Sequence, residues 1–166
     1  MREPLITEPL RTGHRRDAFF CGEAALDVYL KRYATQDQKR RAAAIFVLPD
    51  DNNRIKGYYS LSSTNIPSAD LPANLLKKLP KYAYQPATLL GRLAVDQHDQ
   101  KQGIGETLLL DALYRSYELS KQIGSIAVVV ETLKEQASTF YEQYGFISFP
   151  DQKKLFLPMK TIAQLF

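Results

Sequence analysis

The sequence of 166 residues contains no tryptophan, one cysteine and two histidines. The single cysteine, Cys21, cannot form a disulfide within the chain, and with two histidines it does not make a metal-ligand set. Long apolar runs are missing as well: no stretch approaches the ~18 consecutive apolar residues of a membrane-spanning helix, and the charged N-terminus has no hydrophobic signal core. We therefore expect a cytoplasmic protein without a metal, a disulfide or a membrane anchor.

Composition is that of a globular protein, because hydrophobic residues make up 45% of the chain and charged residues 24%. A chain of this length can bury a substantial core, so we expect one compact domain that spans residues 1–166. The formal net charge is +4. This moderate excess permits an anionic partner but does not by itself demonstrate one.

Basic residues gather in two segments of the sequence. The first lies between residues 31 and 41, the second near residue 80, and their members are Lys31, Arg32, Lys39, Arg40 and Arg41, and then Lys77, Lys78 and Lys81. Two interpretations stay open: each cluster is the solvated face of a helix, or the clusters are a track for a polyanion. A polyanion would be held by phosphate contacts and counterion release, without readout of a base sequence.

The hydrophobic pattern predicts an alternation of strands and helices. A dense turn signal at residues 49–53 separates two strand-like segments and predicts a hairpin. We expect an edge strand within residues 1–12 and further strands at 42–48, 54–66, 89–95, 126–131, 146–149 and 155–159. Helices are expected within 14–34, at 35–41, at 73–79, from Gly103 onward, at 134–143 and at 161–166. The fold class is then α+β, with a mixed, mostly antiparallel sheet and helices on both faces.

The crossing from strand 89–95 to the next helix carries two glycines, Gly103 and Gly105. Glycine lets a backbone approach a ligand closely, and a helix N-terminus offers unpaired N–H groups and the positive end of its dipole. A Rossmann fingerprint would need a third glycine where Leu108 stands, and the Gly-Lys-Ser/Thr of a P-loop is absent. The pattern therefore predicts a binding loop for a diphosphate of another kind.

A second motif lies at residues 137–146, Ala-Ser-Thr-Phe-Tyr-Glu-Gln-Tyr-Gly-Phe. It closes a helix, and Gly145 stands where a C′ glycine ends a helix before the next strand. Two tyrosines, Tyr141 and Tyr144, lie on the last turn. A buried tyrosine is most often a packed core residue whose hydroxyl has a partner, so either tyrosine could be structural.

These motifs together resemble a known family. Gln100-x-x-Gly103-x-Gly105 after Arg92-Leu-Ala-Val resembles the acetyl-CoA loop of the GNAT superfamily of N-acetyltransferases, and residues 137–146 fit a second motif of that superfamily. With Phe20-Cys-Gly and Gly57-Tyr-Tyr added, the chain is similar to the GNAT toxins of bacterial type II toxin–antitoxin systems over roughly residues 14–159. The resemblance implies the GNAT acyl-CoA N-acyltransferase fold.

The resemblance also implies a reaction and partners. GNAT toxins of this kind transfer acetyl from acetyl-CoA to the α-amino group of aminoacyl-tRNA, which blocks translation, and a ribbon-helix-helix antitoxin neutralises them. A homodimer is expected on the same grounds. Tyr33, Tyr82 and Tyr84 could then stack on unpaired bases of a tRNA end.

Site residues are implied in the same way. Tyr141 matches the tyrosine near the CoA sulfur and is our general acid, with Tyr144 as the competing tyrosine. The expected acetyl-CoA contacts are Leu93, Ala94, Val95, Gln100, Lys101, Gln102, Gly103, Ile104, Gly105, Glu106 and Thr107. The expected tRNA contacts are Arg92, Lys31, Arg32, Lys39, Arg40, Arg41, Lys77 and Lys78. No general base is evident, so water could accept the amine proton.

Several alternatives stay open. Arg92 lies on a strand and must reach a surface, a ligand or a carboxylate such as Asp96 or Glu131. His14 is expected at the surface. An N-acetyltransferase of a small-molecule amine or of a protein is the second enzymatic hypothesis, although the basic N-terminal half argues against cationic substrates. A module that binds CoA or nucleic acid without turnover is the third hypothesis, and Tyr141 and the loop glycines disfavour it.

Overall fold

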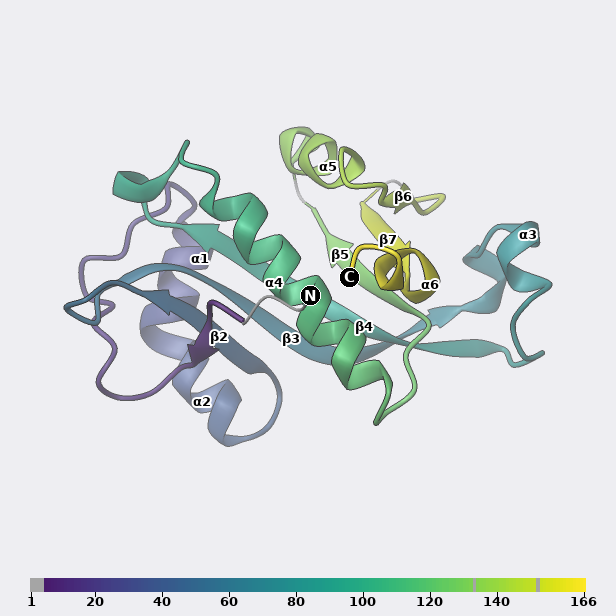
Figure 1. Cartoon of the computed structure of the whole chain (residues 1–166), viewed down its shortest axis with the longest axis horizontal. Coiled ribbons are helices and arrows are strands. Elements are labelled where there is room, and N and C mark those ends of the chain that lie inside the picture. Colours follow the sequence, from purple (N-terminus) through teal and green to yellow (C-terminus); the bar gives the residue numbers. More distant parts are fainter. Residues whose placement is uncertain (1–4, 133, 152) are drawn as a thin grey trace. The chain divides into compact units, whose positions relative to one another are not determined.

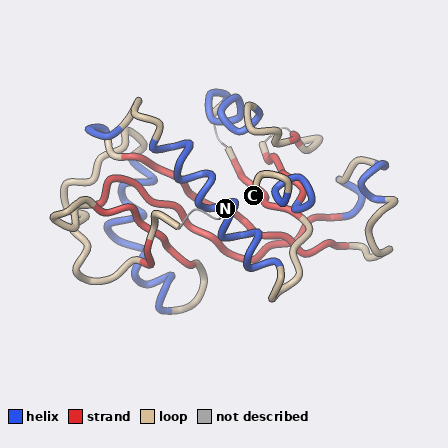
Figure 2. Tube along the Cα trace, in the orientation of Figure 1, coloured by secondary structure: helices blue, strands red, loops and turns tan. Residues whose placement is uncertain are grey.

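The structure is a computed structural model that describes residues 5–132, 134–151 and 153–166 (Figure 1). Seven strands form one sheet in the order β1-β2-β3-β4-β5-β7-β6 (Figure 2). By their internal contacts the residues fall into two compact units. The first unit holds the chain up to Ser62 together with Leu90–Arg115, and the second holds Ser63–Leu89 together with Ser116–Phe166. Two long strands and one long helix have parts in both units.

The first unit begins with strand β1 (Glu8–Pro9), followed by helix α1 (Ala24–Val28), the π-helical turn η1 (Tyr29–Tyr33) and helix α2 (Ala34–Lys39). Strand β2 (Ala44–Pro49) pairs antiparallel with both β1 and β3 (Ile55–Pro67), which confirms the predicted hairpin. Strand β4 (Tyr84–Val95), the 3-10 turn η3 (Gln97–Asp99) and helix α4 (Ile104–Ser120) follow later in the chain. The expected edge strand is β1, and residues 1–4 of that prediction lie outside the described residues.

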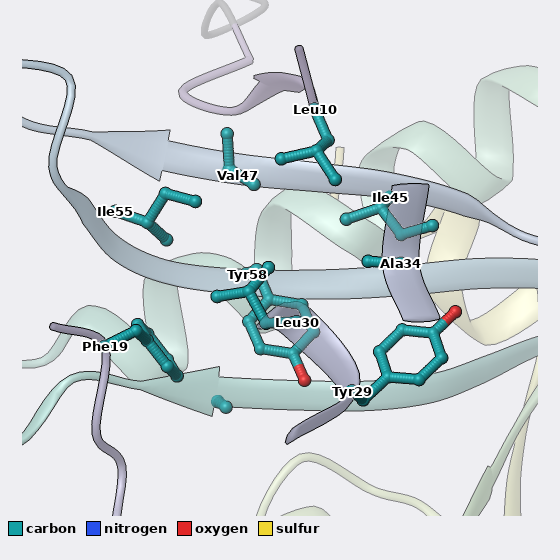
Figure 3. Packing of buried hydrophobic residues seen from close by; sticks show 10 residues of the cluster. Leu10, Phe19, Tyr29, Leu30, Ala34, Ile45, Val47, Ile55 and Tyr58 are labelled. Atoms are coloured by element: carbon teal, nitrogen blue, oxygen red, sulfur yellow. The ribbon is translucent and has the colours of Figure 1, made fainter. Parts of the chain in front are cut away.

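The core of this unit lies between the α1-η1-α2 segment and strands β2 and β3 (Figure 3). Tyr29, Leu30 and Ala34 are buried on one side of the helical segment, and Ile45 and Tyr58 are buried on the strands. Helical spacing places 29, 30 and 34 on one face, so the basic residues Lys31, Arg32 and Lys39 are left in solvent. Asp27 of the same segment is buried, and its carboxylate accepts the Cys21 N–H at 2.9 Å.

A buried carboxylate fixes the N-terminal segment to α4. Asp111 accepts hydrogen bonds from the Ile6 backbone N–H at 2.8 Å, the Thr7 hydroxyl at 2.5 Å and the Tyr59 hydroxyl at 2.6 Å. The Arg115 Nε–H donates in turn to the Tyr59 oxygen at 2.9 Å. Because every member of this buried network has a partner, it stabilises one arrangement of the chain before β1.

The second unit contains the 3-10 turn η2 (Ser68–Asp70), helix α3 (Ala73–Leu76), strand β5 (Ala127–Glu131), helix α5 (Glu135–Glu142), strands β6 (Ile147–Ser148) and β7 (Lys154–Pro158), and helix α6 (Met159–Ala163). Strand β7 pairs antiparallel with both β5 and β6. Residues 127–130 of β5 are all buried, as expected of a strand covered on both faces. Ile66, Ala87, Val129 and Phe156 belong to the core of this unit.

Element bounds differ from the predictions in several places. Strand β4 begins at Tyr84 rather than at Leu89. The expected helix 73–79 ends at Leu76, and the strand expected at 146–149 is two residues long. The last helix starts at Met159 rather than Thr161, directly after Pro158, which is its N-cap. The Met159 N–H, which has no acceptor within the helix, donates to the Ile126 carbonyl at 2.8 Å. Among the described helices none is both long and apolar enough to cross a membrane.

Candidate active site

The exit from β4 is held by the carboxylate of Asp96, which is buried. It accepts hydrogen bonds from the backbone N–H groups of Phe20 and His98, each at 3.0 Å, and the Asp96 N–H donates to the Lys56 carbonyl at 2.8 Å. Burial alone would raise the pKa of Asp96, but these N–H donors, with His98 and Arg54, outweigh burial and lower the pKa. The carboxylate is therefore ionised at neutral pH.

Arg54 connects the β2–β3 turn to the segment after β4. Its guanidinium lies 3.1 Å from Asp50, 3.4 Å from Asp96 and 3.0 Å from Asp99. The hydrogen bond to Asp99 is the main cause that raises the pKa of Arg54. One planar group thus holds three carboxylates and fixes the start of the glycine loop, by which we mean residues 96–105.

Two of the glutamines in the glycine loop, Gln100 and Gln102, shape its backbone. The Gln100 side-chain amide donates to the carbonyls of Cys21 at 2.8 Å and Val95 at 2.9 Å. The Gln102 amide donates to the His98 carbonyl at 3.2 Å. The sequence predicted both as acetyl-CoA contacts, and that role stays a prediction. Because their side-chain amides bind protein carbonyls, what these residues can offer a diphosphate is their backbone N–H.

The loop reaches α4 through two residues with positive φ, Lys101 at 63° and Gly103 at 81°. A Cβ added at Gly103 would have no neighbour within 4 Å, so the backbone there faces open space. The Thr107 N–H and the Thr107 hydroxyl both donate hydrogen bonds to the Gly103 carbonyl, at 3.1 and 2.9 Å. The first N–H groups of a helix have no acceptor inside the helix. The start of α4, with the predicted Ile104, Gly105 and Glu106, therefore presents donors that suit a diphosphate.

The three predicted contacts on β4 lie directly before this loop. Ala94 is buried, whereas Leu93 and Val95 are half-buried. Opposite them Gly57 of β3 is required for packing, because a Cβ there would lie 2.7 Å from the Leu108 Cδ1 atom and 3.0 Å from the Ala94 oxygen. The absence of a side chain at Gly57 lets α4 lie close to the strands that carry the loop.

Arg92 is stacked on an aromatic ring. Its Cζ atom lies 3.4 Å from the centre of the Tyr29 ring, and the Tyr29 hydroxyl donates to Asp37 at 2.7 Å. Burial, followed by this hydrogen bond, raises the pKa of Tyr29 to about 12. The pairing of Arg92 with Asp96 that was considered from the sequence is not formed among the described residues, where Asp96 binds Arg54 instead. Glu131, the other carboxylate considered, pairs with Lys154 at 3.4 Å in the second unit. A cation–π contact holds the guanidinium while its N–H edge can still donate.

Tyr141 lies in the second unit, on α5, and its side chain is buried with 8% exposure. Its ring makes edge contacts with Phe140 and Phe146, with ring centres 5.2 and 5.3 Å away. Burial raises the pKa of Tyr141 to about 12. The phenol is therefore neutral at physiological pH and can act as a proton donor.

The end of α5 confirms the predicted helix stop. Gly145 has a φ of 92°, its N–H donates to the Glu142 carbonyl, and the Phe146 N–H donates to the Tyr141 carbonyl. These two bonds are those of a Schellman motif, and they fix the turn that carries Tyr141. The competing Tyr144 is only half-buried, and its ring packs 5.3 Å from that of Phe140.

The predicted basic residues are all on the surface of the unit that contains them. Those exposed on η1, α2 and the following turn are Lys31, Arg32, Lys39, Arg40 and Arg41, and those exposed beside α3 are Lys77, Lys78 and Lys81. Their exposure is compatible with both open interpretations, a solvated face and a polyanion contact, and their role stays a prediction.

Some residues around the site were missed from the sequence, and one was misplaced. The contact between Arg54 and Asp99 gave no local signal, because the two residues are 45 positions apart in the sequence. His14 was expected at the surface and is 4% exposed; its Nδ1 accepts the Arg11 N–H at 3.0 Å. Burial, followed by the charge of Arg11, lowers the pKa of His14. Among the described residues no three His, Cys, Asp or Glu side chains are placed to hold a metal ion.

Comparison with known proteins agrees with this arrangement. The model of an acetyltransferase (GNAT) domain matches residues 41–148. A tRNA-acetylating toxin of Mycobacterium tuberculosis is 36% identical over 149 residues, which cover 89% of this chain and 88% of that protein. Both observations concern most of the chain rather than a single motif.

Solved structures are similar over almost the whole chain. AtaT complexed with acetyl-methionyl-tRNAfMet has a TM-score of 0.89 and 32% identity, covering 96% of this chain and 97% of that one. A mutant AtaT toxin bound to acetyl-CoA and to the C-terminus of the antitoxin AtaR has a TM-score of 0.81 and 28% identity, covering 96% of each chain. With a glycine loop at a helix start, a buried tyrosine on α5 and these matches, the chain belongs to the GNAT family of acetyltransferases.

Proposed function

We propose that this protein is a toxin that transfers the acetyl group of acetyl-CoA to the α-amino group of aminoacyl-tRNA and so inhibits translation. The observation that carries the proposal is the similarity, over 96% of the chain, to AtaT in complex with acetyl-methionyl-tRNAfMet. The 36% identity to a tRNA-acetylating toxin supports the same substrate. The chain acts as a single catalytic domain, residues 1–166, in this proposal.

The glycine loop and the end of β4 form the acetyl-CoA site. Acetyl-CoA supplies the activated acetyl group as a thioester. The backbone of residues 100–107 binds the diphosphate through N–H groups and the α4 dipole, and the positive φ of Gly103 opens the backbone toward it. Leu93, Ala94 and Val95 line the pantetheine arm, and their backbone groups orient the thioester.

Tyr141 is the general acid. The neutral amine nitrogen attacks the thioester carbonyl carbon, a C–N bond forms, and the tetrahedral oxyanion collapses with cleavage of the C–S bond. The departing thiolate takes the phenolic proton of Tyr141, which is neutral at physiological pH because its pKa is raised, and the resulting phenolate regains a proton from solvent. Water accepts the proton that the amine loses, because we assign no protein base to this step.

The tRNA is held by positive side chains. Arg92, fixed over Tyr29, binds near the acceptor end. The exposed basic residues at 31, 32, 39–41, 77 and 78 bind phosphates. Such contacts act through counterion release and so make tRNA affinity strongly dependent on salt.

Regulation and assembly complete the proposal. A ribbon-helix-helix antitoxin neutralises the toxin, which is supported by the similarity to AtaT bound to its antitoxin AtaR. We propose a homodimer that acts in the cytoplasm, where charged tRNA is used.

The test is transfer of label from acetyl-CoA to total charged tRNA, with uncharged tRNA as the control. We expect label on charged tRNA only, loss of transfer in Tyr141→Phe, and retention in Tyr144→Phe. A wild-type protein that binds acetyl-CoA but leaves charged tRNA unlabelled would disprove the substrate. Small-molecule amines and proteins would then be assayed as acceptors.

A further inference from the structure

The connection between β3 and β4, together with Tyr84 at the start of β4, is called here the β3–β4 arm (residues 68–84), and it contains η2 and α3 (Figure 1). It carries Lys77, Lys78 and Lys81, all exposed. The sequence has no Asp or Glu from Leu71 through Val95. Asp70 is the one carboxylate in the sequence of the arm, which with its three lysines keeps an excess of two positive charges.

The arm has an ordered base. The Ser68 N–H donates to the Ala83 carbonyl at 2.9 Å, and the buried Gln85 amide donates to the Pro80 carbonyl at 2.8 Å and to the Ser68 hydroxyl at 3.2 Å. Leu71 is buried in the core of the second unit. These contacts fix the backbone around Tyr82 and Tyr84 without using either aromatic ring.

Two tyrosine rings are left in solvent on this ordered backbone. Tyr82 is 65% and Tyr84 60% exposed, the highest values among tyrosines of the described chain, where Tyr33 follows with 52%. Gln85 is buried, so its neighbour Tyr84 on the strand faces the opposite way, outward. A rigid support for exposed rings lowers the entropy that a stacking contact would cost.

We propose that Tyr82 and Tyr84 stack on unpaired nucleotides of the tRNA while Lys77, Lys78 and Lys81 contact the adjacent phosphates. Aromatic faces interspersed with cations are the surface that single-stranded nucleic acid uses, because each base has a π-face and each linkage a charge. The inference rests on the proposed function and adds the part of the tRNA that the arm recognises. The unpaired nucleotides come from the 3′ end of the acceptor stem or from a loop.

The test compares tRNA affinity of the wild type with that of the double variant Tyr82→Leu/Tyr84→Leu. Its matched control, Tyr82→Phe/Tyr84→Phe, keeps both rings. Stacking on a base typically changes affinity by about fivefold or more per ring. We expect the Leu variant to lose at least about tenfold in affinity for uncharged tRNA and the Phe variant to stay within about twofold, with equal melting temperatures for all three proteins.

Measuring tRNA affinity at several salt concentrations distinguishes the contribution of the tyrosine rings from that of the lysines. Substituting Lys77, Lys78 or Lys81 by Gln lowers the slope of log affinity against log salt by about 0.7 to 0.9 for each phosphate that is no longer neutralised. The Leu variant keeps the wild-type slope, because a tyrosine neutralises no phosphate. A slope that falls in the Leu variant would assign the effect to a rearranged arm and overturn the inference.

Three RNAs identify the nucleotides: full-length tRNA, an acceptor-stem minihelix with an unpaired 3′ end, and the same minihelix with a blunt end. A defect on the minihelix that disappears with the blunt end assigns the 3′ end, and a defect on full-length tRNA alone assigns a loop. Wild-type affinity of the Leu variant for all three RNAs, or an equal loss on the blunt duplex, overturns the inference.

Two further outcomes concern the oligomeric state of the protein and the proposed function itself. A Leu variant that becomes monomeric in sedimentation while keeping its RNA affinity overturns the inference and assigns the rings to a second copy of the chain. A wild-type protein that neither binds nor acetylates tRNA rejects the proposed function itself. Retained acetyl transfer by the wild type with unchanged RNA affinity in the Leu variant rejects only the role of the arm.

Discussion

The Arg54 guanidinium and the Asp99 carboxylate lie 3.0 Å apart, although the two residues are 45 positions apart in the sequence. The same guanidinium contacts Asp96, whose carboxylate receives the Phe20 and His98 N–H groups. A single side chain beside β3 thus fixes the backbone that leads into α4, and the proposed diphosphate site at the start of α4 depends on it.

We expect Arg54→Gln to raise KM for acetyl-CoA by on the order of tenfold while kcat changes little, because the glycine loop loses its position but the transfer chemistry is untouched. Three carboxylates would lose a charged partner, so the free energy of unfolding should fall by about 1–3 kcal/mol. Steady-state kinetics and urea denaturation measure the two effects.

Arg54→Lys separates charge from geometry at this position. Lysine keeps the charge but cannot reach three carboxylates with one planar group, so we expect an intermediate KM. If both variants kept the wild-type KM, the contacts of Arg54 would be merely structural.

Gly103→Ala tests the positive φ of the loop. Its φ of 81° is unfavourable for alanine, although a Cβ there has no neighbour within 4 Å. The strain should cost about 1–2 kcal/mol locally, and the added methyl group should obstruct the diphosphate. We expect a raised KM for acetyl-CoA with a fold that remains intact by circular dichroism.

Gly124→Ala is the matched control, because a Cβ there also meets nothing within 4 Å and its φ is not in the left-handed region. It should leave KM unchanged. An equal rise of KM in both variants would argue against a special role of Gly103.

Tyr141→Phe should lower kcat by about 10²- to 10⁴-fold with little change of KM for acetyl-CoA, since a general acid contributes that much to a rate. Tyr144→Phe should stay close to wild type. A large loss in Tyr144→Phe with an active Tyr141→Phe would transfer the role to the second tyrosine.

The pH dependence of kcat follows from the raised pKa of Tyr141. With a pKa of about 12 the phenol keeps its proton through pH 10, so deprotonation of the acid should cause no fall of kcat between pH 7 and 10. In the unfolded chain a tyrosine ionises near pH 10. The stabilisation from its burial is therefore complete below about pH 10 and is lost as pH rises from there through 12, which alkaline denaturation of wild type against Tyr141→Phe would measure.

Asp111→Asn should destabilise the fold by about 2–4 kcal/mol, because the carboxylate accepts three hydrogen bonds in a buried site next to Arg115. Kinetic constants at low temperature should stay near those of the wild type. Glu106→Gln, on an exposed residue of the same helix, is the control for a change of charge. Equal stability of the two variants would show that the network contributes little.

The sequence was sufficient to predict features that depend on neighbouring residues. Gly145 has the positive φ that its place as a C′ glycine suggested, and Tyr141 lies on the expected helix. Interactions between distant segments could not be predicted. The partners of Arg54, the burial of His14 and the stacking of Arg92 on Tyr29 are set by strand pairing and packing, for which the residues themselves give no periodic signal.

The hydrogen bonds of the glycine loop also determine at which step its backbone loses conformational entropy, on folding or on binding of acetyl-CoA. Arg54, Asp96 and the Gln100 amide hold the loop through contacts within the protein, so its backbone is fixed when the chain folds rather than when acetyl-CoA arrives. Ordering a residue costs about 1–2 kcal/mol. Acetyl-CoA should therefore bind without a slow rearrangement, and its association should follow a single concentration-dependent phase close to the rate of encounter.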